Sequence, residues 1–187
     1  MKQVMKQAAP ARNYWIGVVS KTHVDKAVAG GFTQLNHGKA GPLERMREGD
    51  GFAFYSPRVE HPYGAPLQAF TAIGRVGRAA IFQVDEGGGF VPFRRAVDYL
   101  TAHEAPIKPL LEGLSFIRNK AFWGAAFRFG FVKVPEVDFA LIAAAMGREL
   151  ARDFPPDFPP TGNGLPTSTG HRLLPLTGRG PDADVPR

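Results

Sequence analysis

The apolar segments of this chain are short, and glycines and prolines interrupt them at close intervals. Residues 14–19, 50–56 and 68–76 are rich in aromatic and β-branched side chains, which favours strands. A short helix is expected at 23–29, because two glycines follow at 30–31. Five to seven strands among three or four short helices, without regular alternation, predict an α+β fold with a mixed, barrel-like sheet.

The chain is predicted to have three parts. Residues 1–12 are expected to be a loose leader, and residues 13–147 are expected to form one domain with a real core, in a chain with an ordinary apolar fraction of 44%. Residues 148–187 are expected to be a disordered tail, because from Ala151 onward eight prolines and five glycines leave little room for a regular packed element. No internal repeat is visible in the rest.

Positive charge is concentrated in the predicted domain. The formal net charge is +6, from 23 Lys plus Arg against 17 Asp plus Glu. Residues 148–187 hold five of each sign, so the first 147 residues carry the whole excess, 18 against 12. A basic folded domain attracts phosphate polymers before any specific contact forms.

Several classes of site and location are excluded or disfavoured by composition. The chain has no cysteine, so a disulfide framework, a thiolate zinc site, an iron–sulfur cluster and a cysteine nucleophile are impossible. Its start lacks an apolar run of signal-peptide length, and no segment approaches the roughly 20 apolar residues of a membrane helix. We therefore expect a cytoplasmic protein that has no cofactor and no membrane partner.

The sharpest polar motif is Asn36-His37-Gly38-Lys39. It places an amide, an imidazole and an ammonium group within four residues, and its glycine allows the backbone to approach a ligand closely. Together these groups could hold a base edge and a phosphate. In the alternative interpretation, Asn36 and His37 satisfy local backbone groups and Lys39 is solvated.

Trp15, Phe32 and Tyr55 are candidate stacking faces for a nucleobase, although aromatic residues in strands usually belong to the core. Strand alternation places Tyr55 opposite two neighbouring phenylalanines, so it is expected to point away from the packed face. Ser56, the next residue, would offer a donor and an acceptor at the mouth of a pocket.

Two pairs of residues are candidates for further polar contacts. Arg94 and Arg95 interrupt a strand-like apolar pattern and could contact phosphates bidentately, or lie solvated at a strand edge. Ser20 and Lys21 follow directly on the first predicted strand and, like the two arginines, could contact a ligand or be solvated.

Signals for catalysis are weak. The five histidines lack the spacing of a helical metal site, and no Gly-x-Ser-x-Gly motif is present. Ser56, His37 and Asp50 could be imagined as a triad, but these residue types often recur by chance. A binding module is therefore expected, without catalytic residues. Two alternatives stay open: a nucleotide sensor or small-molecule enzyme with His37 as general base, and an interaction module whose tail recruits a partner.

A series of short motifs resembles the EVE domain family, in particular its small bacterial single-domain members. This family is a branch of the PUA-like superfamily related to the YTH readers of methylated adenine in RNA. The resemblance spans Asn13 to Met146. The motifs that carry it include Asn13-Tyr14-Trp15-Ile16, Gly31-Phe32, Gln34, His37-Gly38-Lys39, Gly49-Asp50, Tyr55-Ser56-Pro57, Phe70-Thr71-Ala72-Ile73-Gly74, Pro92-Phe93-Arg94-Arg95, Leu114-Ser115-Phe116-Ile117 and Phe127-Arg128-Phe129-Gly130.

The resemblance implies a PUA-like β-barrel with short flanking helices, whose pocket takes a modified base flipped from RNA or DNA. By analogy, that pocket would be lined by Ser20, Lys21, Phe32, Thr33, Gln34, Asn36, His37, Lys39, Tyr55 and Ser56. The YTH readers line their methyl pocket with several tryptophans, whereas this chain has only Trp15 and Trp123. A preference for methyladenine is therefore not expected, and an aromatic cage would have to use Phe or Tyr.

Overall fold

The computed structural model describes residues 11–155 and the backbone of residues 173–174. Its strands are β1 (Tyr14–Val18), β2 (Phe32–Thr33), β3 (Gly51–Arg58), β4 (Pro66–Val76), β5 (Phe82–Val84), β6 (Phe93–Leu100), β7 (Ala105–Pro106), β8 (Phe131–Val134) and β9 (Leu173–Leu174). Its α-helices are α1 (Lys21–Gly30), α2 (Ala40–Glu44), α3 (Glu136–Ala145) and α4 (Leu150–Asp153), and its 3-10 helices are η1 (Asn36–Gly38), η2 (Lys108–Gly113) and η3 (Trp123–Phe127).

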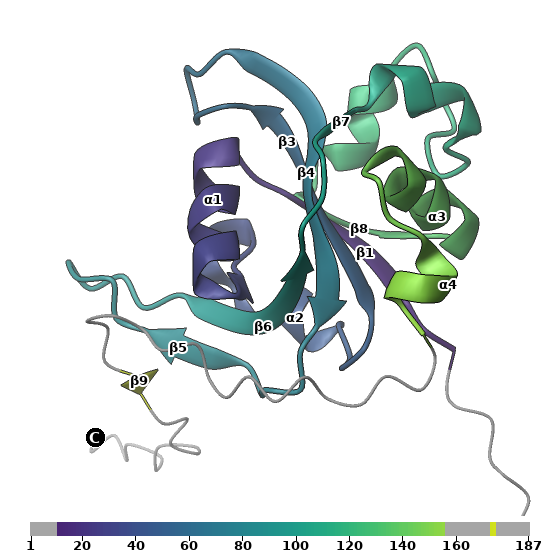
Figure 1. Cartoon of the computed structure of the whole chain (residues 1–187). Helices are drawn as coiled ribbons and strands as arrows, with labels where there is room; N and C mark the ends of the chain where they lie inside the picture. The colour runs from purple at the N-terminus through teal and green to yellow at the C-terminus, as the bar shows by residue number, and fades with distance from the viewer. Residues whose placement is uncertain (1–10, 156–172, 175–187) are drawn as a thin grey trace, which may run out of the picture.

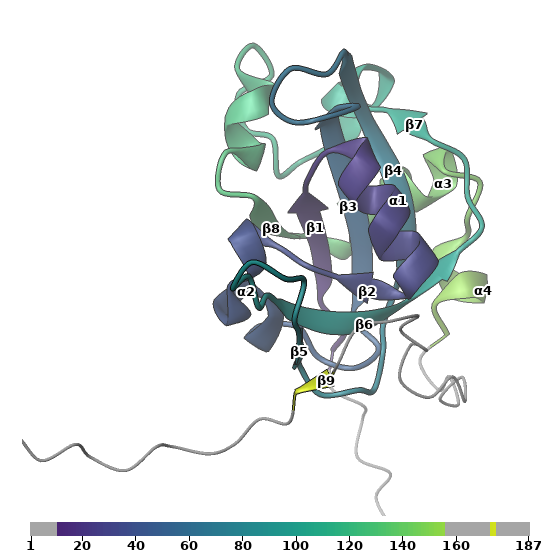
Figure 2. The same cartoon turned by 90° about the vertical axis from the view of Figure 1, so that its left-hand side faces the viewer.

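The strands form one mixed sheet in the order β8-β1-β3-β4-β6-β5-β9, with β2 also paired to β6 and β7 to β4. The β1 and β3 strands run parallel, and the remaining pairs are antiparallel. The sheet curls strongly, so β6 and β5 turn across the lower end of the other strands (Figures 1 and 2). The prediction of an α+β fold with a mixed, barrel-like sheet is confirmed.

Both faces of the curled sheet are packed. The α1 and α2 helices lie on one face, and α3, α4 and the chain between β7 and β8 lie on the other (Figure 1). The domain has two hydrophobic cores, one between the sheet and α1 and one between the sheet and α3. Along β3, Phe52 and Phe54 belong to the core under α1, and Ala53 and Tyr55 belong to the core under α3. This is the two-residue period of a strand that is buried on both sides. No helix among the described residues is long and apolar enough to span a membrane.

The α1 helix confirms the predicted short helix and starts two residues earlier. Ser20 occupies its N-cap position. Its C-cap residue Gly31 has φ 63°, and the Gly31 N–H reaches the carbonyls of Ala27 and Val28. The left-handed conformation has a low free-energy cost for glycine, which explains why the helix ends here.

The buried carboxylate of Asp50 ties the start of β1 to the turn before β3. Asp50 is only 3% exposed and accepts hydrogen bonds from Trp15 Nε1 at 2.8 Å, the Asn13 amide at 3.0 Å and the Arg47 amide at 2.9 Å. Hydrogen bonds to a charged acceptor are stronger than neutral ones. The motifs Asn13-Tyr14-Trp15-Ile16 and Gly49-Asp50 therefore have a structural role.

A second buried carboxylate, that of Asp138, ties α3 to the segment that follows η2. Asp138 accepts from the Ser115 amide at 3.0 Å, the Ser115 hydroxyl at 3.0 Å and the Phe116 amide at 2.8 Å. It fixes the segment after η2 against the first turn of α3, which accounts for the Leu114-Ser115-Phe116-Ile117 motif.

The folded unit extends past the predicted boundaries at both ends. Arg12 donates to the carbonyls of Phe154 and, at 2.8 Å, Pro155. Phe154 is buried, and its ring lies 5.5 Å from that of Phe139. The prediction of a disordered tail was therefore wrong for residues 148–155, because an apolar residue anchors them. Residues 1–10, 156–172 and 175–187 lie outside the described chain, so the leader and tail predictions remain untested there.

We predict that Asp50→Ala lowers the free energy of unfolding by about 3 kcal/mol, because it leaves the buried Trp15 Nε1 and two partly buried backbone amides without their acceptor. Urea unfolding followed by circular dichroism measures the change. Glu112→Ala, at an exposed position, is the control and should stay within about 0.5 kcal/mol of the wild type. An equally small change for Asp50→Ala would contradict the role of this carboxylate.

Candidate nucleic-acid interface

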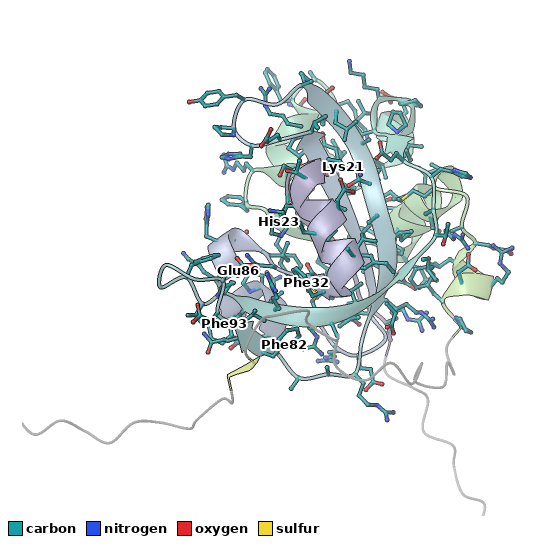
Figure 3. The ribbon with its side chains drawn as sticks, turned by 60° about the vertical axis from the view of Figure 1, so that its left-hand side comes forward. Lys21, His23, Phe32, Phe82, Glu86 and Phe93 are labelled. Carbon is teal, nitrogen blue, oxygen red and sulfur yellow. The ribbon has the colours of Figure 1, made fainter. Side chains whose placement is uncertain are left out.

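The predicted site residues lie in four places. Some gather where α1, β2 and β6 meet, others lie on the η1 loop, two lie on β3, and Ser20 and Lys21 lie at the start of α1. Figure 3 shows the first place, with His23 on α1, Phe32 on β2, and Glu86, Phe82 and Phe93 on or beside the β5–β6 hairpin, and it shows Lys21 at the other end of α1.

Arg94 organises the first place. Its Nε donates to Gln34 Oε1 at 2.9 Å, its guanidinium lies 3.9 Å from the centre of the Phe32 ring, and it forms an ion pair with Glu86. With His23, these side chains form what we call the Arg94 cluster (His23, Phe32, Gln34, Glu86 and Arg94). A hydrogen bond, a counterion and an aromatic face together compensate a guanidinium that is only 8% exposed.

The solvent-edge placement expected for Arg94 and Arg95 was wrong. The β6 strand has partners on both sides at this point: Arg94 is opposite Phe82 of β5, and Arg95 is opposite Thr33 of β2. Burial lowers the pKa of both guanidinium groups. Arg94 is consequently not a free phosphate-binding cation, because its charge is already paired inside the protein.

His23 belongs to the same cluster and was missed in the sequence. Its Nε2 is buried and has no hydrogen-bond partner among the described residues. Burial lowers its pKa, and the Arg94 charge adds to this, while a backbone hydrogen bond with Gln34 and the Glu86 charge act in the opposite direction. The sequence signal that could have indicated its partial burial was its position on α1 directly before Val24, which faces the core.

Two predicted hydroxyl residues are completely buried. Thr33 Oγ1 has no partner within the described chain. Ser56 Oγ lies 2.8 Å from Thr71 Oγ1, where β4 carries one residue more than β3. The prediction that Ser56 lies at the open mouth of a pocket was therefore wrong, because its hydroxyl pairs with Thr71 of the bulged strand β4.

Ser20 and Lys21 lie at the start of α1, as predicted, but they already have partners. Ser20 Oγ is 3.1 Å from Thr22 Oγ1. The Lys21 ammonium pairs with Asp25 and, at 3.5 Å, with Glu104. The hydrogen bond with Asp25 raises the pKa of Lys21. Its charge would have to be shared with any ligand that reached it.

The η1 loop has an unusual backbone. Asn36 and His37 have φ angles of 47° and 58°. These angles lie in the left-handed region, which is unfavourable in free energy for any residue other than glycine. Two close approaches support this conformation: a Cβ on Gly130 would lie 2.3 Å from Asn36 Oδ1, and one on Gly38 would lie 2.4 Å from Pro92 Cβ. His37 and Lys39 are exposed on the supported loop.

Phe90 is an aromatic residue at this loop that the sequence did not single out. It is partly exposed, and its ring is next to Gly38, 3.5 Å from where a Cβ would stand. It follows three glycines, all with positive φ, which bring the chain after β5 back toward η1. An aromatic residue directly after such a turn was the missed signal.

Tyr55 is not available for stacking on a ligand. It is 2% exposed, its ring stacks on Phe127 at 4.2 Å and 18°, and Phe70 packs at 5.6 Å. The expectation that Tyr55 points away from a packed face was wrong, because η3 covers the second face of the sheet. Trp15 is also buried, stacked on Phe131.

The imagined triad has no support in the described residues. Ser56 is paired with Thr71, and the Asp50 carboxylate is occupied by Trp15 and backbone amides. His37 is exposed on the η1 loop. No contact that joins these three side chains is present in the described chain.

One cleft of the structure lies away from these places. It is lined by Arg12, Tyr14 and Phe154 together with charged residues of both signs, Arg47, Glu48 and Glu136. None of the predicted pocket residues lines it. Desolvation and the nearby Glu136 raise the pKa of Tyr14 there.

A curled mixed sheet, short helices on both faces and a supported polar loop beside α1 define a small α+β domain of the PUA-like class. The sequence model of the EVE domain matches residues 13–145, and the chain belongs to the EVE domain family. The fold implied by the resemblance is thereby confirmed, and this class is consistent with a nucleic-acid-binding module.

Three similar bacterial proteins are UPF0310 proteins. One from Mycolicibacterium gilvum is 50% identical over 136 residues, which cover 73% of this chain and 96% of the relative. The Mesorhizobium japonicum protein msl3206 is 51% identical over 72% of this chain and 91% of its own length. YdcG of Bacillus subtilis is 44% identical over 74% of this chain and 95% of its own length. These relatives are small single-domain proteins, and about a quarter of this chain lies outside each match.

We predict that His23 contributes to the loss of stability in mild acid. Its pKa is lowered in the folded state, so unfolded His23, with a pKa of about 6.5, takes up a proton first as the pH falls. Stability is therefore fully present above that pH and declines below it. Chemical unfolding at pH 7 and pH 5 should show a smaller decline for His23→Gln than for the wild type. The exposed His103→Gln control should decline as the wild type does, and an identical decline for all three would contradict the assignment.

Proposed function

We propose that this protein is a non-enzymatic nucleic-acid-binding module that receives the edge of a modified nucleobase at the Arg94 cluster. In this proposal His23 reads the base edge, and the exposed His37 and Lys39 of the η1 loop contact the adjoining sugar and phosphate. The basic domain attracts the polymer through its charge.

The observation that carries the proposal is His23 Nε2, a buried polar atom without a hydrogen-bond partner in the described chain. A buried donor or acceptor left unpaired costs about 1 to 3 kcal/mol, so such atoms usually have a partner or a function. The lowered pKa favours a neutral imidazole, in which each ring nitrogen can make one hydrogen bond. Since the ring already makes a hydrogen bond with the backbone of Gln34, Nε2 is left to pair with one polar group of a base edge.

The surroundings of His23 support recognition more than catalysis. Arg94 and Gln34 hold each other, and Glu86 pairs with Arg94, so the groups around the imidazole are fixed before any ligand arrives. A fixed set of polar groups favours selection among similar bases. The two alternatives, a nucleotide sensor and an enzyme that uses the same place, predict binding or turnover of free nucleosides.

The test is binding to a panel of RNA and DNA oligonucleotides that carry different modified bases, with free modified nucleosides alongside, at two salt concentrations. The wild type should bind one modified base preferentially and lose affinity at the higher salt concentration. His23→Asn should weaken that binding by about tenfold, because one good contact to a base is worth about 1 to 3 kcal/mol. Glu112→Ala serves as the matched control and should bind as the wild type does.

Three results would contradict the proposal. Oligonucleotide affinity that is unchanged in folded His23→Asn would exclude His23 as the contact. Binding of free nucleosides alone would favour a sensor, and their conversion would favour an enzyme.

A further inference from the structure

A second surface, on β8 and the residues beside it, carries aromatic and cationic side chains that the proposed base contact does not use. Phe129, two residues before β8, is 70% exposed. The guanidinium of its neighbour Arg128 lies 4.6 Å from the centre of the Phe129 ring. A large apolar ring in water, with a cation against it, presents a flat face that a further planar group can cover.

Two further cations lie beside β8. Arg45, which follows α2, lies 5.2 Å from the Trp15 ring and 5.4 Å from the Phe131 ring, and Lys133 Nζ lies 5.7 Å from the Trp15 ring. Both side chains are exposed, and neither they nor Arg128 form an ion pair within the part of the chain that the structure describes. We call Arg45, Arg128, Phe129 and Lys133 the β8 surface.

The β8 surface is joined to the proposed base contact through the η1 loop. Asn36 packs directly on Gly130, the residue after Phe129, and Gly38 packs on Pro92 and Phe90. Phe90 follows the turn that starts after Glu86 of the Arg94 cluster, and its amide donates to the Gly87 carbonyl at 3.0 Å. In Figure 2, α2 and the edge strand β8 lie next to each other at the left of the view, with β2 beside them. A nucleic-acid strand that runs from the Arg94 cluster along the η1 loop would therefore reach Phe129 next.

We propose that the β8 surface binds single-stranded nucleic acid next to the recognised base, with a flanking base stacked on Phe129 and phosphates held by Arg45 and Lys133. This inference rests on the proposed function and adds to it the state of the polymer and the place of its backbone.

The chemistry of these residues favours a single strand. A base can stack on Phe129 only if its face is free, and in a duplex both faces of an internal base are covered by neighbouring pairs. Cations without acidic partners suit a phosphate backbone better than a neutral or basic protein surface. The surface is therefore expected to discriminate by strandedness and only weakly by sequence.

The first experiment compares single-stranded and duplex oligonucleotides of about 12 nucleotides, a length within the usual site size of such surfaces. Each single strand is also made with abasic sites on both sides of its central base. Wild-type protein, Phe129→Ala and Phe129→Leu are titrated with each probe, and Phe122→Ala is the control because Phe122 is similarly exposed, at 72%, outside the β8 surface.

Loss of the Phe129 ring should weaken single-strand binding by roughly 5- to 150-fold, which corresponds to about 1 to 3 kcal/mol for one stacked base. The abasic probe should weaken wild-type binding by a similar factor and cause no further loss in Phe129→Ala. Phe129→Leu keeps an apolar side chain and removes the flat face, so it should behave like Phe129→Ala. Phe122→Ala should bind like the wild type.

The second measurement is the salt dependence of Arg45→Gln/Lys133→Gln. Its slope of log affinity against log salt should be smaller than that of the wild type by about 1 to 2, whatever the sequence of the strand.

The outcomes separate this inference from the proposed function. If the wild type binds single strands and Phe129→Ala binds them equally well, or if abasic flanks do not weaken wild-type binding, the β8 surface is not the strand contact and the proposed function stands. Stronger binding to duplex than to single strands also overturns the inference. If the wild type binds no oligonucleotide at all, the proposed function fails and this inference fails with it.

Discussion

The hydrogen bonds of the buried Asp50 carboxylate are the interaction on which the rest of this domain depends. They connect the first residues of β1 to the turn that starts β3, and they orient the Trp15 indole. The oriented indole in turn supports Phe131, Arg45 and Lys133 on the β8 side of the sheet. One carboxylate thus connects the start of β1 to the turn before β3 and holds the indole beside which the exposed cations of β8 lie.

A second internal charge shapes the other side of the domain. The Arg94 guanidinium needs compensation because it is buried, and Gln34, Glu86 and the Phe32 ring supply it from three different segments. This cluster leaves the His23 imidazole beside fixed neighbours. The η1 loop, held in a left-handed conformation by Pro92 and Gly130, connects the cluster to the β8 surface. The charged and aromatic groups around His23 are therefore held by contacts within the protein before any ligand binds.

Local patterns predicted the parts of the fold that depend on nearby residues. The β-rich segments, the short helix before Gly31 and the absence of regular alternation gave the class of sheet, and the family motifs gave its type. The patterns could not show that η3 packs on the second face of the sheet. Residues 52–55 form a continuous apolar run, which is typical of a strand buried on both faces, and Tyr55 was misplaced because only the face of Phe52 and Phe54 was taken to be packed. Arg94 and Arg95 were misplaced because β6 pairs with β2, which is distant in the sequence, as well as with its hairpin partner β5. His23 was missed for the same reason, since its importance depends on contacts with Gln34, Glu86 and Arg94.

An NMR measurement of the imidazole nitrogens of His23, while the best-binding modified oligonucleotide from the panel is added, tests whether the base is received at His23. We expect the Nε2 resonance of His23 to move with saturation of the protein, because the base edge becomes its hydrogen-bond partner, while the exposed His103 ring does not respond. Saturation of the protein with no change at His23 would contradict the central claim that the base is received there.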